Sequence, residues 1–119
     1  MLTDNEKKQI LHSFLETVEG ISDKEYQKRV WIRGEGPEVD DFDETVCYFF
    51  DDGDPILKNY KEFGITDSQY KLLSEFRDQF ESFSDENYWP PMFIDSPEWT
   101  KITTRAKEVL EAFHYNQNA

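Results

Sequence analysis

The residues with the greatest capacity for chemistry are carboxylates gathered in one stretch of the chain. Residues 34–54 contain nine Asp or Glu residues, and no Lys or Arg occurs between Arg33 and Lys58. Such a group can attract a positively charged partner, hold a metal ion, or act in acid–base catalysis. The aromatic run 48–50 (Tyr-Phe-Phe) lies inside the stretch, where it would supply apolar anchors for binding.

A dedicated metal or cofactor site is not expected. An EF-hand loop needs Gly at its sixth position and acidic ligands at its first, third and fifth. Counting back from Gly53 places Tyr48 first, so the calcium pattern fails. The single cysteine, Cys47, excludes a Cys-built zinc site and an intramolecular disulfide, and this fits a reducing cytoplasm.

Catalysis is not expected either. The candidate groups are Cys47, His12 and His114, and they form no known catalytic spacing. Negative charge around Cys47 would raise the pKa of its thiol and blunt its reactivity. The sequence GEGPE at 34–38 is acidic and would repel a phosphate.

The charge balance narrows the class of partner. The 119-residue chain has a formal net charge of −13, from 26 acids and 13 bases. Two blocks without any base, 34–57 with nine acids and 78–100 with six, carry more than this whole net charge. No basic stripe exists for direct nucleic-acid binding, and no apolar run or signal-peptide pattern indicates a membrane. A basic protein partner in the cytoplasm is therefore expected.

The elements that must position these residues are predicted to be helices. Three capping boxes mark helix starts, and Asp54-Pro55 and Ser96-Pro97 add an N-cap followed by proline. The boxes are Thr3-x-x-Glu6, Ser22-x-x-Glu25 and Thr66-x-x-Gln69, with Asp41-x-x-Glu44 as a weaker one. Glycines 20, 34, 53 and 64 stand where helix C-caps are expected.

Apolar residues at helical spacing lie between these signals. The predicted fold is an all-α, compact bundle of about six short helices in a single domain, 1–119. A 16% aromatic content supplies its core. The helices are expected near 4–19, 23–33, 42–52, 55–63, 67–82 and 97–115, with short extended pieces possible at 30–32 and 92–94.

The predicted helix 42–52 has two distinct faces. At 100° per residue, Phe42, Val46, Phe49 and Phe50 point to the core while Tyr48 points outward. The acids expected around Tyr48 are Asp40, Asp41, Glu44, Asp51 and Asp52. This face is either a solvated helix surface or a binding surface with an aromatic hot spot.

The segment 86–95 (ENYWPPMFID) is the second unusual stretch. Its two prolines are expected to forbid a helix and to favour an extended path. It either crosses the bundle and closes the core, or it forms an aromatic patch at the same interface. The full set of predicted partner-binding residues is Glu35, Glu38, Asp40, Asp41, Asp43, Glu44, Tyr48, Asp51, Asp52, Asp54, Tyr88 and Trp89.

A small acidic helical chain with the segments DDFDETVCYFFDD and ENYWPPMF resembles the bacterial immunity proteins. The resemblance lies in charge, size and helical class rather than in a motif, and the YFF at 48–50 does not reproduce a paired-Tyr signature of helical nuclease-colicin immunity proteins. It implies binding and neutralisation of a basic toxin, such as a nuclease of a colicin or contact-dependent growth inhibition system. No binding residue is transferred from the family.

Two other functions compete with this one. A nucleic-acid mimic of the anti-restriction type would use the carboxylates in place of phosphates, and it needs one long negative surface. A plain helical adaptor would use them for solubility alone. Replacing Asp40, Asp41, Asp43 and Glu44 by amides is expected to abolish partner binding without unfolding if the acidic face is the interface.

Overall fold

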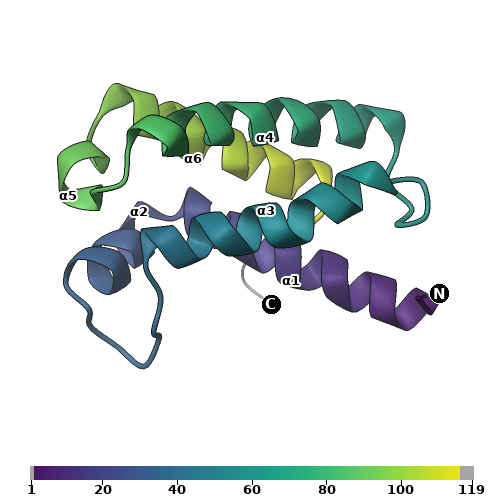
Figure 1. The fold of residues 1–119 in the computed structure, drawn as a ribbon, viewed down its shortest axis with the longest axis horizontal. Helices are drawn as coiled ribbons and strands as arrows, with labels where there is room; N and C mark the ends of the chain where they lie inside the picture. Colours follow the sequence, from purple (N-terminus) through teal and green to yellow (C-terminus); the bar gives the residue numbers. More distant parts are fainter. Residues whose placement is uncertain (1, 116–119) are drawn as a thin grey trace.

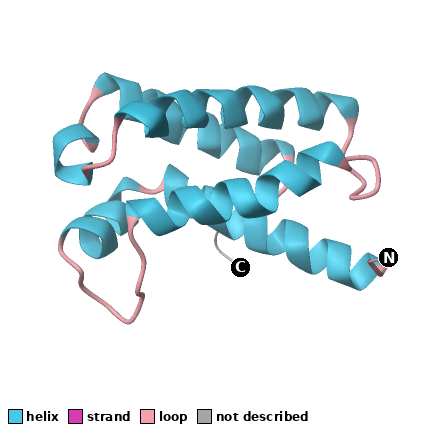
Figure 2. Ribbon diagram, in the orientation of Figure 1, coloured by secondary structure: helices cyan, strands magenta, loops and turns pink. Residues whose placement is uncertain are grey.

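Four long helices form most of the structure, a computed structural model that describes residues 2–115. No strand occurs among these residues, which confirms the all-α prediction (Figure 2). No helix within this range is long and apolar enough to cross a membrane. The elements are α1 (Asp4–Ser22), α2 (Lys24–Tyr26), the π-helix η1 (Gln27–Ile32), α3 (Phe42–Lys58), α4 (Asp67–Glu86), α5 (Pro90–Phe93) and α6 (Pro97–Ala112).

The long helices close into a ring of neighbours. Helix α1 packs against α3 and α6, and α4 packs against the same two helices. Successive long helices run in opposite directions along the longest axis of the molecule (Figure 1). The loop between η1 and α3 and the short helix α5 both lie at one end of this axis, on the left in Figure 1.

Most of the predicted helix starts are confirmed. Thr3 and Thr66 each form a complete capping box, and Ser96 and Asp41 each accept a hydrogen bond from a backbone N–H of the first turn. The box predicted at Ser22 is wrong, because α1 continues to that residue. Its hydroxyl donates to a carbonyl of the preceding turn, and Asp23 caps α2 instead.

The helix break predicted at residues 53–55 does not occur. Helix α3 runs through Pro55 to Lys58, so the predicted helix 55–63 and the Asp54 N-cap are wrong. Gly53 is buried inside this helix, and a Cβ there would come within 2.8 Å of the ring of Phe14 on α1. Gly53 therefore allows α1 and α3 to approach closely, which is a different use of glycine from a C-cap.

The core is built largely from aromatic rings, as the composition predicted. Phe49, Phe76 and Phe80 are fully buried and in mutual ring contact, with centroids 4.9 to 6.1 Å apart. Phe42 faces the same core, while Tyr48 is 56% exposed. The division of the α3 faces was therefore predicted correctly for these residues.

A buried amide joins three segments of the bundle. Gln27 is fully buried, and its Nε2 donates to the carbonyls of Gly20 and Ile21, both at 2.8 Å. Its Oε1 accepts from Trp99 Nε1 at 2.8 Å. These bonds tie the C-terminal end of α1 and the first turn of α6 to η1. Residues 30–32 belong to this π-helix, so the extended piece considered from sequence is absent at these positions.

The segment 86–95 folds differently from the prediction. Pro90 and Pro91 are the first two residues of α5, where the missing backbone N–H groups would have had no helical partner. Residues 92–94 are therefore not extended. Pro90, Phe93 and Ile94 are buried and close the core. Their neighbours Tyr88, Trp89 and Met92 are exposed, so the segment serves the core with one side and the surface with the other.

Candidate functional site

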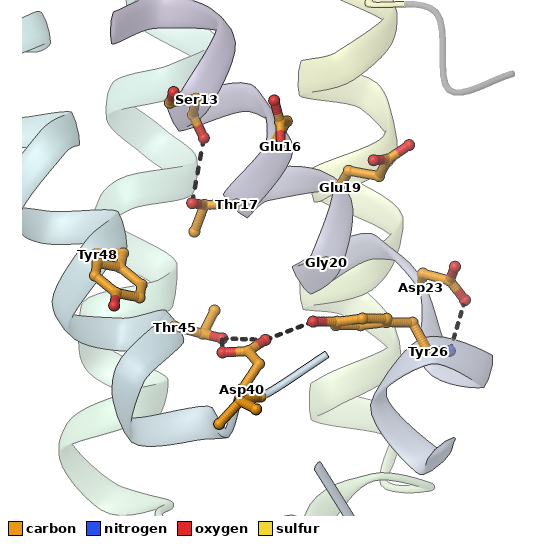
Figure 3. A pocket seen from close by; sticks show the side chains of 11 residues that line it. Ser13, Glu16, Thr17, Glu19, Gly20, Asp23, Tyr26, Asp40, Thr45 and Tyr48 are labelled. Atoms are coloured by element: carbon orange, nitrogen blue, oxygen red, sulfur yellow. Dashed lines mark hydrogen bonds between the residues drawn. The ribbon is translucent and has the colours of Figure 1, made fainter. Parts of the chain in front are cut away.

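A surface groove of about 390 Å³ lies between α1, α3 and the loop before α3, and we call it the acidic groove. Figure 3 shows its lining side chains, which come from four separate segments of the chain. The lining residues are Ser13, Glu16, Thr17, Glu19, Gly20, Asp23, Tyr26, Val39, Asp40, Thr45 and Tyr48. Four of them are carboxylates and none is Lys, Arg or His.

One wall of the groove is the C-terminal half of α1. Glu16 and Glu19 are three residues apart, and Asp23 follows four residues later, just after the helix ends. This spacing places the three carboxylates along one side of a helix. Asp23 also accepts a hydrogen bond from the backbone N–H of Tyr26 at 3.1 Å, so it has a fixed position.

Asp40 forms the base of the groove and is held by side chains from three elements. Its Oδ2 accepts hydrogen bonds from Tyr26 Oη at 2.8 Å and from Trp31 Nε1 at 3.0 Å. Thr45 Oγ1 lies 3.2 Å from its Oδ1. Burial and the bond to Asp40 raise the pKa of Tyr26 well above its usual range, so the phenol remains a neutral donor. Asp40 therefore does not lie on the exposed face predicted for it.

The groove keeps a negative field despite these internal bonds. Burial raises the pKa of Glu19, and the nearby carboxylates of Glu16 and Asp23 raise it further. A hydrogen bond donated by Tyr115 lowers this pKa but does not cancel the rise. Glu16 contacts the exposed His12 at 3.0 Å on the outer side of α1. A cation placed in the groove would relieve the repulsion among these carboxylates.

An exposed ridge on α3 borders the groove. Glu44 precedes Tyr48 by four residues and Asp51 follows it by three, so the three side chains share one helix face. Both carboxylates are exposed and form no ion pair among residues 2–115. The predicted arrangement of an outward Tyr48 between acids is therefore present at these positions.

Other predicted acids have partners within the chain. Glu38 pairs with Arg29 through two bonds of 2.8 Å, which lower the pKa of the Glu38 carboxyl to about 2. Glu35 pairs with Arg33. Asp41 accepts from the backbone N–H of Glu44 at 2.8 Å as the α3 cap.

The two base-free blocks of the sequence meet at Arg77 of α4. Its guanidinium lies 3.0 Å from Asp54 in the first block and 3.0 Å from Glu81 in the second. It also lies over the ring of Phe50, 5.1 Å from the centroid. The blocks are therefore in contact, but a cation from another part of the chain stands at their junction.

Asp43 and Asp52 complete the predicted set on α3. Asp43 is exposed, and no ion pair to it occurs in the described range. Asp52 is half-buried beside α1 and does not line the groove; it lies in a neighbouring cleft with Glu6 and Ser13. Burial and the neighbouring charge of Asp51 raise the pKa of Asp52.

Tyr88 and Trp89 lie apart from the groove, and together with Met92 they form what we call the aromatic tip. None of the three lines the groove, and all are exposed, at 77%, 58% and 81% respectively. The structure thus contains two candidate surfaces rather than the single interface that the sequence suggested.

No group of three or more His, Cys, Asp or Glu side chains within residues 2–115 is placed to hold a metal ion. Cys47 is exposed on α3. No hydrogen bond in the same range joins it to His12 or His114.

The carboxylates of α1 were missed by the sequence reasoning. Residues 1–33 hold six acids and six bases, so their net charge is zero and drew no attention. The available signal was the spacing of Glu16, Glu19 and Asp23 together with the absence of Lys and Arg between Lys8 and Lys24.

Comparisons with protein-family models, with curated proteins and with solved structures find no match to this chain.

Proposed function

We propose that this chain binds a basic protein domain and blocks its activity, as an immunity protein neutralises a toxin. The observation that carries the proposal is the acidic groove, in which carboxylates from α1 and from the loop before α3 converge without a single Lys or Arg among the lining residues. Opposite charges on a partner would steer association and fix its orientation on this surface.

The ridge beside the groove supports the same function. Tyr48 presents a large ring at low conformational-entropy cost, with Glu44 and Asp51 on either side of it. Aromatic side chains of this kind are enriched at interface hot spots, and neighbouring carboxylates select for cations on the partner. A basic toxin, a nuclease in particular, would lose activity if its substrate-binding surface were covered in this way.

A nucleic-acid mimic remains the alternative to test. It would require carboxylates at phosphate-like intervals over a long surface. Arg29, Arg33 and Arg77 neutralise Glu38, Glu35 and Asp54 and therefore interrupt such a surface. These ion pairs favour a discrete basic partner over a general DNA-binding cleft.

The test is capture of the partner with variants of equal charge. Lysate of the source organism is passed over the wild-type chain and over the groove variant E16Q/E19Q, with washes at low and at high salt. The control is E62Q/E75Q, which removes two exposed carboxylates that do not line the groove.

We expect one basic protein to survive the high-salt wash on the wild type and the control, and to be lost or reduced on E16Q/E19Q. Its enzymatic activity should fall when the chain is added. A set of DNA-binding proteins that all elute with salt would favour the mimic, and equal capture by all three chains would exclude the groove as the interface.

A further inference from the structure

The aromatic tip concentrates exposed apolar surface in a short segment. Seven large apolar side chains are exposed among residues 2–115, and three of them lie within positions 88–92. Scattered single residues of this kind are ordinary on protein surfaces, whereas a group marks an interaction site. Trp89 is also the N-cap of α5, and its carbonyl accepts from the Met92 N–H at 2.9 Å, so the two side chains belong to one turn.

The tip is held rigidly from below. Phe93 is buried, and its ring centroid lies 4.9 Å from that of Phe42 and 5.0 Å from those of Phe83 and Trp99. Pro90 is buried as well and fixes the backbone dihedral at the start of α5. Because the turn is already ordered, a partner that binds the tip loses little free energy to ordering it.

Two carboxylates precede the tip in the chain and are unpaired within residues 2–115, whereas Asp95, which follows it, pairs with Lys28 of η1 at 3.4 Å. Asp85 and Glu86 are exposed residues in the last turn of α4, which contains no basic residue. Neither forms an ion pair within the described part of the chain. The C-terminal end of a helix carries a partial negative charge, so two further carboxylates there are unfavourable until a cation approaches.

Cations lie over aromatic rings at three places within residues 2–115, and two of the three are arginines: Arg29 over Tyr26 and Arg77 over Phe50, with Lys61 over Tyr60 as the third. Arg77 lies over the Phe50 ring and binds the carboxylates of Asp54 and Glu81 at the same time. A guanidinium can do both because its face stacks on a ring while its edge donates to carboxylates. Residues 85–89 offer the same two components, unpaired carboxylates at the end of α4 followed by exposed rings of the tip, and contain no arginine.

From this match we infer that the aromatic tip receives an arginine side chain of the basic protein partner. The guanidinium stacks on the ring of Trp89 or Tyr88 and donates to Asp85 or Glu86. This inference rests on the proposed function, since it assigns a second contact to the same partner. It also predicts a preference for arginine over lysine, because an ammonium group cannot stack and donate through a planar fork.

Trp89 provides a direct reporter for the test. The chain has three indole N–H groups. Those of Trp31 and Trp99 donate to Asp40 and Gln27, and Trp99 is buried. The three indole signals are assigned by single substitutions in ¹H–¹⁵N spectra. The intact chain is then titrated with two synthetic peptides of equal length and charge, one arginine-rich and one lysine-rich.

We expect the arginine peptide to shift the Trp89 signal and to bind about two- to five-fold more tightly than the lysine peptide. The variant D85N/E86Q should lose this preference, and the control E62Q/E75Q, with the same net charge, should keep it. Calorimetric titration of Trp89→Ala should show the same loss without unfolding, because the side chain is exposed.

Three results would overturn the inference. If the peptides shift the indole signal of Trp31, whose N–H donates to Asp40 in the groove, but not that of Trp89, the tip takes no arginine while the groove and the proposed function stand. If both peptides shift Trp89 equally, the tip responds to charge alone. If no signal moves with either peptide, the inference fails together with the proposed recognition of a basic partner.

Discussion

The acidic groove and the aromatic tip are built in opposite ways. The groove is concave, and its lining residues are brought together by tertiary packing from four segments between Ser13 and Tyr48. The tip is a run of five positions, 88–92, whose exposed side chains stand on buried neighbours. In the proposed function, charge recognition would depend on the relative placement of α1 and α3, whereas apolar anchoring would depend on one local turn.

The two surfaces also differ in how far their groups are already engaged. Asp40 accepts hydrogen bonds from Tyr26 and Trp31, so a partner cation would share a carboxylate that is already bonded. The exposed rings of the tip have no such competing bonds, and binding removes their apolar area from water. In the proposed complex, the groove would orient the partner and the tip would hold it.

The largest change in the free energy of unfolding is expected for Phe93, which lies beneath the aromatic tip. Phe93→Ala removes a buried ring in contact with Phe42, Phe83 and Trp99, and such truncations destabilise by about 3–5 kcal/mol. Trp89→Ala, only four residues earlier, should change the free energy of unfolding by less than about 0.5 kcal/mol because the side chain is exposed. Urea unfolding of both variants measures the contrast.

Equal destabilisation by the two substitutions would contradict the division of the segment into a core side and a surface side. Met92→Ala is the matched control, since Met92 is next to Phe93 but exposed. Its stability should resemble that of Trp89→Ala.

An intermediate effect is expected at the base of the groove. Asp40→Ala leaves the donors of Tyr26 and Trp31 without their acceptor in a half-buried setting, and should destabilise by about 2 kcal/mol. Asp40→Asn keeps one oxygen acceptor, so it should lower the free energy of unfolding by about half as much. Asp43→Asn, an exposed carboxylate three residues later, serves as the control and should stay within about 0.5 kcal/mol of the wild type.

This expectation changes the interpretation of a broad acid-to-amide substitution in residues 40–44. Asp40 orders the groove and Asp41 caps α3, so their replacement would weaken the fold as well as the charge. Loss of binding in such a variant would not separate the two causes. Asp40→Asn with retained binding would show that its role is positional rather than direct.

The fold could be read from the sequence where the signals are local. The capping boxes at Thr3 and Thr66 and the apolar stripes of α4 and α6 depend on neighbouring residues alone, and they were placed correctly. Gly53 misled the prediction because it lies inside α3 against Phe14 rather than at a helix end, and Pro55 misled it because α3 continues through that residue. The two prolines of α5 were misread for a different reason, since proline is well tolerated in the first turn of a helix, where its missing N–H has no helical partner.

The candidate site was predicted in part. The grouping of Tyr48 with Glu44 and Asp51 followed from helical periodicity. Asp40 was predicted as part of the same region, but on an exposed face rather than in the half-buried position it has. The α1 wall did not follow from block charges because residues 1–33 are neutral in sum, and the pairs Arg29–Glu38 and Arg77–Asp54 did not because each joins residues of two different blocks. Counting charge along a sequence finds an acidic segment but not the bases that fold back onto it.

The smallest effect is a pH dependence that belongs to the groove. The pKa of Glu19 is raised above 4.5, chiefly by burial and also by Glu16 and Asp23, while Tyr115 and His12 act in the opposite direction. Between 4.5 and the raised pKa the folded chain holds more protons at this position than the unfolded chain. Its contribution to stability therefore declines as the pH rises through that window.

The check is the urea midpoint measured at closely spaced pH values. With rising pH through this window, the midpoint of E19Q should decline less than that of the wild type, and the midpoint of E62Q/E75Q should decline as the wild type does. A partner cation in the groove favours the charged carboxylate, so binding should weaken as the pH falls through the same window. Binding that weakens equally in the wild type and in E19Q would assign the pH dependence to other carboxylates. Loss of the dependence in E19Q alone would place the partner's cation beside Glu19, in the groove rather than at the tip.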